Sequence, residues 1–166
     1  MVREFSDRPI DDVQVERILH AGRRTGSSKN LQRWTFIVVR DRKRLVNLAK
    51  VGPFAGHLAG AAMATALVTP DPHAANAPLS IIFDIGRVAQ NMVLAAWDLG
   101  IVSCPATVHD QGRVREILGI PSDHHCEYII SFGHPADSAT LRATKRSTGR
   151  RQLNDVTRFE QWDSFS

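Results

Sequence analysis

A polar stretch early in the chain carries a dense set of hydrogen-bonding side chains. Residues 25–34 read Thr-Gly-Ser-Ser-Lys-Asn-Leu-Gln-Arg-Trp, in which Ser27, Ser28, Asn30 and Gln32 all offer donors or acceptors. Small hydroxyl and amide side chains compete with the backbone for hydrogen bonds, so they favour loops. The stretch is therefore predicted to hold the polar edge of a ligand between two rigid elements, or to be an ordinary turn after a helix.

Positive charge gathers late in the chain. The net charge is +4, which favours an anionic partner. The late cations are not interleaved with aromatic residues, and no nucleic-acid reading motif is present, so a phosphate-bearing small ligand is favoured and nucleic acid is the alternative. The late basic residues are Arg142, Lys145, Arg146, Arg150 and Arg151.

The cysteines and histidines are candidate metal ligands. Cys104 and Cys126 are the only two cysteines, and their apolar surroundings suit reduced buried thiols rather than a disulfide. His124, His125 and Cys126 are adjacent, but neighbouring residues of a strand point to opposite faces and the usual ligand spacings are missing. No metal site is predicted.

Helical patterns alternate with short apolar runs along the chain. Asp11, Asp41 and Asp110 each precede a helical pattern and are predicted N-caps, with Gln14 completing a capping box after the first. From their spacing, the following residues are predicted to point inward: Val15, Ile18, Leu19 and Gly22 in the first helix, Leu45, Val46, Leu48 and Ala49 in the second, and Val114, Ile117 and Leu118 in the third, before Gly119.

A longer helical pattern covers residues 81–99 and is apolar over most of its circumference. Gly100 follows as the residue that ends it. We expect this helix to be the central helix of the domain or part of a dimer interface. The repeating apolar positions are Ile81, Ile85, Val88, Ala89, Met92, Val93, Ala96 and Leu99.

Apolar runs, rich in β-branched or aromatic residues, predict strands at 34–39, 64–69 and 126–133, and residues 101–106 are predicted to be a short strand or an extended segment. The 166 residues, 43% of them hydrophobic, suit one domain spanning residues 1–166. No run is long enough to span a bilayer and the N-terminus lacks a signal-peptide core, so a cytoplasmic protein is expected.

In the C-terminal extension, residues 136–166, the apolar residues need another surface to cover them, which suggests a partner subunit. These residues are Leu153, Val156, Phe159 and Trp162.

The order of several short motifs resembles the flavin-dependent nitroreductase family over most of the chain. The family's Pro-Ser-Ser-x-Asn-x-Gln-Pro-Trp loop is matched by residues 26–34, in which Gly26 and Arg33 stand at the two proline positions. The other markers are Arg-Glu-Phe and Asp-Arg-Pro-Ile at residues 3–5 and 7–10, Asp-Ile-Gly to Asn-Met at 84–92 with Leu-Gly at 99–100, Leu-Gly-Ile-Pro at 118–121, Phe-Gly-His-Pro at 132–135, and Gly-Arg-Arg-Gln-Leu at 149–153.

The resemblance implies an α+β fold: a three-layer α-β-α sandwich with a mixed sheet around a long central helix. It also implies an obligate homodimer that holds flavin mononucleotide (FMN) at the subunit interface. Carried over by position, the loop would reach the flavin of the other subunit through Gly26, Ser27, Ser28 and Asn30. Arg3 would lie near the pyrimidine end of the ring.

The same resemblance assigns backbone N–H groups of Ala106 and Thr107 to the ring edge with the reactive nitrogen, and Arg150 or Arg151 to the phosphate. The family's Arg-Arg-Ser-like triplet has no counterpart before Arg3 in this sequence. Either the sequence begins after the true start of the protein, or the phosphate depends on the late cations alone, which are Lys145, Arg146, Arg150 and Arg151.

The function implied is that of an FMN-dependent oxidoreductase. It would pass hydride from NADH or NADPH to a small electrophile such as a nitroaromatic or a quinone. The cofactor supplies the redox chemistry, so no protein nucleophile or metal is required. A non-catalytic flavin-binding or storage protein is the alternative.

Overall fold

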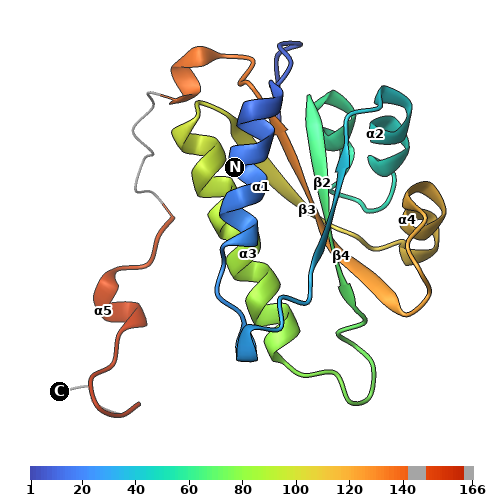
Figure 1. The fold of residues 1–166 in the computed structure, drawn as a ribbon. Helices are drawn as coiled ribbons and strands as arrows, with labels where there is room; N and C mark the ends of the chain where they lie inside the picture. The colour runs from blue at the N-terminus through green and yellow to red at the C-terminus, as the bar shows by residue number, and fades with distance from the viewer. Residues whose placement is uncertain (142–148, 163–166) are drawn as a thin grey trace.

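The computed structural model describes residues 1–141 and 149–162, in which a four-stranded sheet lies between two layers of helices (Figure 1). Helices α1 and α3 cover one face of the sheet, and α2 and α4 cover the other. The helices are α1 (Asp12–Arg23), α2 (Arg42–Leu48), α3 (Ser80–Asp98), α4 (Gln111–Leu118) and α5 (Leu153–Val156); the strands are β1 (Thr35–Val39), β2 (Met63–Pro70), β3 (Val102–Thr107) and β4 (His124–Gly133); the 3₁₀ turns are η1 (Ser28–Asn30), η2 (Gly56–Gly60) and η3 (Ser138–Leu141).

The strand order is β1-β2-β4-β3, and each neighbouring pair is antiparallel. The predicted α-β-α sandwich is confirmed, but the expectation of a mixed sheet is wrong for the described strands. The connection through α3 makes β2 and β3 run in the same direction (Figure 1). The last strand, β4, inserts between them and runs the opposite way, so no two parallel strands are neighbours.

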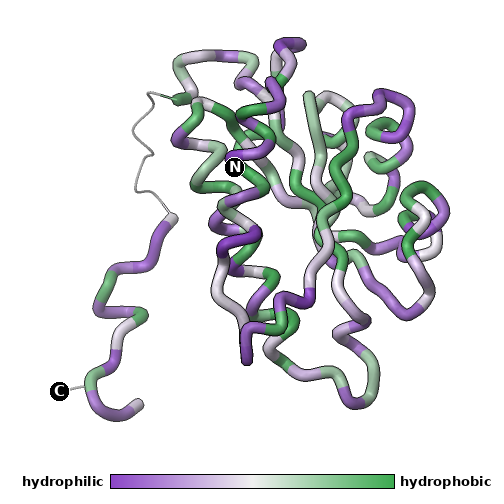
Figure 2. Tube along the Cα trace, in the orientation of Figure 1, coloured by the Kyte–Doolittle hydropathy of each residue, from purple (hydrophilic) through white to green (hydrophobic). Residues whose placement is uncertain are grey.

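The sheet separates two apolar cores, and the hydrophobic residues follow the strands through the middle of the molecule (Figure 2). Alternate residues of β2 point to opposite faces. One core joins the sheet to α1 and α3 through residues that include Ile18, Met63, Leu67, Ile85, Met92 and Phe132. The other joins it to α2 and α4 through residues that include Leu45, Leu48, Ala66, Val114, Cys126 and Ile129.

The predicted helix caps are confirmed by local hydrogen bonds. The Asp11 side chain accepts from the backbone N–H of Gln14 at 2.8 Å, and Gln14 completes the capping box. Asp41 and Asp110 cap α2 and α4 in the same way. Gly119 ends α4 in the left-handed conformation, with φ of +67°.

The prediction that Val46 of α2 points inward is wrong. Leu45 and Leu48 are fully buried, but Val46 is 41% exposed. Helix α2 is only seven residues long, and it packs on the core through one narrow face. Residues at i and i+3 share a face, whereas the next residue is turned about 100° away.

Helix α3 packs against α1 on one side and leaves apolar residues exposed on the other. Contact with α1 is close, because a Cβ atom added at Gly22 would lie 2.8 Å from Cγ of Met92. The outer side of α3 exposes Ile82 (40%), Phe83 (67%), Leu94 (57%) and Trp97 (46%). Burial of such a face would be worth roughly 25 cal/mol per Å² of apolar surface.

The C-terminal stretch, residues 149–162, lies apart from the sandwich (Figure 1). Its predicted apolar residues are largely exposed: Leu153 is 74% exposed, Val156 58%, Phe159 78% and Trp162 80%. Arg142, Lys145 and Arg146 fall outside the described residues. Within the described residues, we find no helix with the length and apolar character needed to cross a bilayer.

Candidate functional site

The polar loop after α1 contains unusual backbone conformations. Lys29, Asn30 and Gln32 have φ values of 52°, 55° and 47°, in the left-handed region. That region costs a residue other than glycine roughly 1–2 kcal/mol. Such conformations persist where the surroundings enforce them, and they cluster at ligand-binding sites.

Helix α3 holds the loop in this shape. The backbone N–H of Ser28 donates to Oδ2 of Asp84 at 2.9 Å, and Asp84 is only 7% exposed. Two turns further along α3, the Asn91 amide donates to Oγ1 of Thr25 at 2.8 Å. Inside the loop, the backbone N–H of Gln32 donates to Oγ of Ser27 at 2.9 Å. The loop is therefore fixed to α3 at two points and braced internally.

Gly26 is explained by the neighbouring arginine of α3. A Cβ atom at Gly26 would lie 3.3 Å from Nη2 of Arg87, which is tighter than ordinary packing. Arg87 is placed by Asp84, 3.9 Å from its guanidinium, and by the ring of Phe83, whose centroid is 5.5 Å from Cζ. The absence of a side chain at Gly26 leaves room for this cation beside the loop.

The loop presents polar groups that its own contacts do not use. Ser28 and Asn30 are exposed. Asn30 Oδ1 accepts from the Gln32 amide at 3.1 Å, but within residues 1–141 and 149–162 no partner is found for the Asn30 NH₂ group or the Ser28 hydroxyl. These groups are free to contact a ligand.

Arg33, at the second proline position of the family loop, lies beside a groove of the structure. It lines an open groove of about 550 Å³ together with residues of the β2–α3 connection, including Asp71, Asn76 and Pro78. The side chain is half-buried. It therefore adds positive charge to the groove at the end of the sheet.

Arg3 lies at the opposite end of α3 from the loop. The backbone N–H of Val2 donates to the Ser103 carbonyl in β3 at 3.2 Å, and the Glu4 carbonyl accepts from Ala136 at 3.2 Å. Arg3 itself is exposed.

The positive charge of Arg3 affects the pKa of a buried histidine, His57. His57 Nδ1 lies 2.8 Å from the Ser131 hydroxyl, which donates to the Cys104 carbonyl at 3.0 Å. Because the hydroxyl hydrogen is used there, Nδ1 of His57 must be the donor. Burial, and secondly the positive charge of Arg3, lower the pKa of His57 below its ordinary value. The imidazole is therefore a neutral tie between η2 and β4.

The two predicted backbone donors of β3 differ in direction. Residues of an antiparallel strand alternate between those bonded to the partner and those whose N–H and C=O groups point away. Because the Ser103 carbonyl accepts from Val2, Ser103 faces the open edge of the sheet. Thr107, four residues on, shares that direction and is exposed, whereas Ala106 is buried and directed to β4.

The predicted phosphate-binding arginines belong to the stretch that lies apart from the sandwich. Arg150 and Arg151 are both exposed. Arg151 donates to the Asp155 carbonyl within the same stretch. The structure therefore places these cations on an accessible segment that is not packed against the loop of its own chain (Figure 1).

The predicted site residues do not meet within one chain. The loop contacts α3 at Asp84, and Arg3 lies beside the strand that follows the other end of α3. At 1.5 Å per residue, the helix from Asp84 to its end is roughly 20 Å long. Within one chain, the loop and Arg3 are therefore separated by the length of α3.

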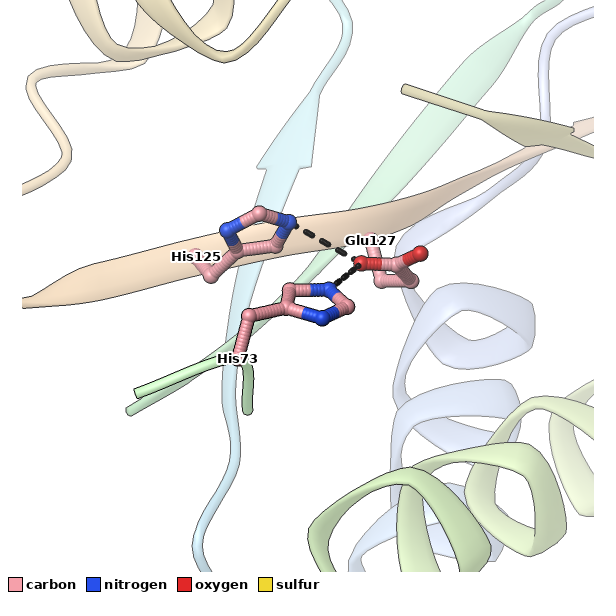
Figure 3. A group of neighbouring side chains, drawn as sticks. All are labelled: His73, His125 and Glu127. Carbon is pink, nitrogen blue, oxygen red and sulfur yellow. Dashed lines mark hydrogen bonds and ion pairs between the residues drawn. The ribbon is translucent and has the colours of Figure 1, made fainter. Parts of the chain in front are cut away.

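Sequence reasoning missed two features. One is Asp84 with Arg87, which support the loop; a lone carboxylate in an apolar helix pattern was the available signal. The other is a cluster of His73, His125 and Glu127, in which both imidazole rings point to one carboxylate (Figure 3). No short motif joins these three residues, because α3, β3 and α4 lie between His73 and β4 in the sequence.

Comparison with known proteins places this fold and loop in a family. The profile of the nitroreductase family matches residues 1–57 and 52–134. A protein of Archaeoglobus fulgidus assigned as an NADH dehydrogenase/NAD(P)H nitroreductase is 36% identical over 141 residues, which are 82% of this chain and 80% of that protein. The NADPH-flavin oxidoreductase of Vibrio harveyi is 31% identical over 157 residues, or 85% of this chain and 64% of the relative.

Solved structures show the same architecture. The FMN-dependent nitroreductase of Clostridium difficile R20291 superposes with a TM-score of 0.82 at 25% identity, covering 97% of this chain and 94% of that one. The fold is also that of the Vibrio harveyi NADPH:FMN oxidoreductase, with a TM-score of 0.84 at 24% identity over 99% and 75% of the two chains. These neighbours define the class as α+β flavin oxidoreductases. The chain belongs to the nitroreductase family.

Proposed function

We propose that this chain is an FMN-dependent oxidoreductase that moves hydride from NADH or NADPH to a small electrophile such as a nitroaromatic or a quinone. Family membership supports the reaction class. The observation that carries the assignment to this chain is the loop: a strained backbone, pinned by buried Asp84, that presents unused polar groups at Ser28 and Asn30. An ordinary turn would not need that support.

The residues present fit the chemical groups of FMN. Hydroxyl and amide groups of the loop suit the polar edge of the ring, and the open-edge N–H of Thr107 is a further donor. The exposed Arg3 suits the pyrimidine end, where a fixed guanidinium stabilises negative charge. Arg150 and Arg151 suit the phosphate, since arginine forms paired charge-assisted hydrogen bonds. When bound, FMN supplies the hydride-accepting and hydride-donating chemistry.

We also propose that the working unit is a homodimer with the site at its interface. The loop and Arg3 lie at opposite ends of α3 in one subunit, so a partner is needed to bring such residues together. The exposed apolar residues of α3 and of the C-terminal stretch give that partner surface to cover. Obligate dimer interfaces have this hydrophobic character.

Two measurements on the purified protein test the proposal. Heat-released cofactor should run as FMN in chromatography, and NADPH or NADH should be oxidised steadily when a quinone is added. Tight flavin binding without nucleotide oxidation would instead indicate a storage protein. Sedimentation at micromolar concentration should show a dimer; a monomer that still holds flavin would contradict the shared site.

A further inference from the structure

The histidine–glutamate cluster lies where the β2–α3 connection crosses β4. His125 and Glu127 are two residues apart on β4, at a shift in the register between β2 and β4, and their side chains meet. His73 comes from the connection after β2 and reaches the same point (Figure 3). The side chains of His125 and Glu127 are 13% and 21% exposed, and that of His73 is 60% exposed. The cluster is thus anchored in the sheet and open to solvent on one side.

The distances in the cluster match those between ligands of one metal ion. Nε2 of His125 lies 2.9 Å, and Nε2 of His73 3.2 Å, from Oε2 of Glu127. All three atoms lie within 4.8 Å of one another. Ligands at about 2.1 Å around a tetrahedral ion are separated by roughly 3.4 Å. Small side-chain rotations would therefore surround an ion with these three atoms.

The hydrogen bonds also show what an ion would replace. An ionised carboxylate only accepts, so both Nε2 atoms carry a hydrogen in this arrangement. A divalent cation can take the place of these two shared hydrogens and use the two nitrogen lone pairs and the carboxylate oxygen. Each imidazole would then carry its hydrogen on Nδ1.

Asp71 lies beside both histidines of the cluster. Its Oδ1 accepts from the backbone N–H of His73 at 2.9 Å, which fixes the turn that carries this ligand. The same oxygen lies 3.7 Å from Nδ1 of His125. Carboxylates placed behind metal-bound histidines orient the ring and favour the Nδ1–H form. Asp71 thus contacts the backbone of His73 and lies beside the ring of His125.

The adjacent thiol does not take part. Cys126 faces the other side of the sheet, in the core beneath α2 and α4, and burial raises the pKa of its thiol to about 12. It therefore stays protonated at neutral pH. His124 points to Asp123, 2.8 Å away, rather than into the cluster. The expectation that His124, His125 and Cys126 do not converge is confirmed.

We propose that His73, His125 and Glu127 form a binding site for a divalent transition-metal ion of the zinc type, separate from the flavin site. Two imidazole nitrogens and one carboxylate suit such ions, whereas Mg²⁺ and Ca²⁺ prefer oxygen ligands. Three protein ligands leave a fourth position for water. The ion ties the β2–α3 connection to β4.

Zinc titration of the full-length protein by calorimetry tests the site. After removal of metals with a chelator and of the chelator by dialysis, the parent should bind one Zn²⁺ per chain and melt at a higher temperature with zinc, because the ion binds the folded state. Mg²⁺ should do neither. Co²⁺ should give the visible absorption of a nitrogen- and oxygen-ligated ion. Failure of the parent to bind zinc saturably would overturn the proposal.

Substitutions of the proposed ligands test whether the ion binds at this cluster. His73→Ala and Glu127→Gln should each weaken zinc binding about tenfold or more, since even residues behind the ligands change metal affinity by roughly 10–100-fold. His124→Ala is the matched control, an adjacent histidine outside the cluster, and should bind as the parent does. Melting curves without zinc check that each variant folds. Unchanged zinc binding in both ligand variants, or equal loss in His124→Ala, would overturn the assignment.

Discussion

The polar loop after α1 and the histidine cluster on β4 are assembled in opposite ways. The loop draws its groups from one short stretch and holds them in a strained backbone, with left-handed residues at Lys29, Asn30 and Gln32. The cluster draws its groups from distant parts of the chain, and no positive φ is found at His73, His125 or Glu127. In this protein the polar groups gathered in one loop come with backbone strain, whereas those that converge across the sheet do not.

The two regions also differ in the chemistry of their groups. The loop offers neutral hydroxyl and amide groups, with a cation nearby at Arg87, which suits the edge of a polar ring. The cluster offers lone pairs and a carboxylate, which suit a cation. If this contrast is right, changes around the flavin site will alter FMN binding and leave zinc binding intact. Each variant below is therefore to be measured with both ligands.

The largest effect is expected at the exposed arginine pair. A charge-assisted contact contributes roughly 1.5–3 kcal/mol, and every 1.4 kcal/mol corresponds to a tenfold change in affinity. Replacing Arg150 and Arg151 with Ala should therefore weaken FMN binding more than about a hundredfold, measured by fluorescence titration. Riboflavin, which has no phosphate, should lose little.

The control for this pair is the double variant Arg42→Ala/Arg44→Ala on α2, which should bind FMN as the parent does. Zinc binding should be the same in all three proteins. Equal loss of FMN and riboflavin in the Arg150/Arg151 variant would mean that the phosphate is bound elsewhere.

The next largest effect is expected at the support of the loop. Asp84→Ala removes a buried acceptor from the Ser28 N–H, a contact to a charged group worth roughly 1.5–3 kcal/mol. Thermal unfolding should show a lower melting temperature, and FMN binding should weaken because the loop is no longer fixed. Asp98→Ala is the matched control: its carboxylate, 79% exposed and 3.9 Å from Arg17, should matter little.

A smaller effect is expected from the loop side chain itself. Asn30→Ala should weaken FMN binding several-fold, since a neutral hydrogen bond contributes about 1 kcal/mol. Its melting temperature should stay close to that of the parent, because the side chain is exposed. Asn76→Ala, an exposed amide in another loop, should bind FMN normally. Unchanged flavin affinity in Asn30→Ala would reduce the loop to a simple helix exit.

The smallest effect is expected from relieving the strain. Lys29 has φ of 52°, which glycine adopts without cost, so Lys29→Gly should raise stability by up to about 1 kcal/mol after the entropy loss of glycine is subtracted. Lys43→Gly within α2 should do the reverse by a similar amount. Denaturant unfolding measures both. A destabilised Lys29→Gly protein would show that the loop is not strained.

The sequence alone predicted features that depend on neighbours along the chain. Asp11, Asp41 and Asp110 cap helices because the groups they satisfy lie three residues away. Gly119 ends α4 because it adopts positive φ without steric cost. The loop was predicted because its polar residues are consecutive, although its strain and its contact with Asp84 were not. The roles of Arg3, Ala106, Thr107, Arg150 and Arg151 toward FMN stay predictions.

Only the tertiary structure decided the features that depend on strand pairing. Insertion of β4 between β2 and β3 made the sheet antiparallel, and the position of α2 on that sheet left Val46 exposed. The same insertion brought His125 and Glu127 to the connection that carries His73. A sequence specifies contacts within a helical turn directly, because the spacing is fixed by the backbone. Contacts across a sheet depend on strand order and register, which the whole core selects at once.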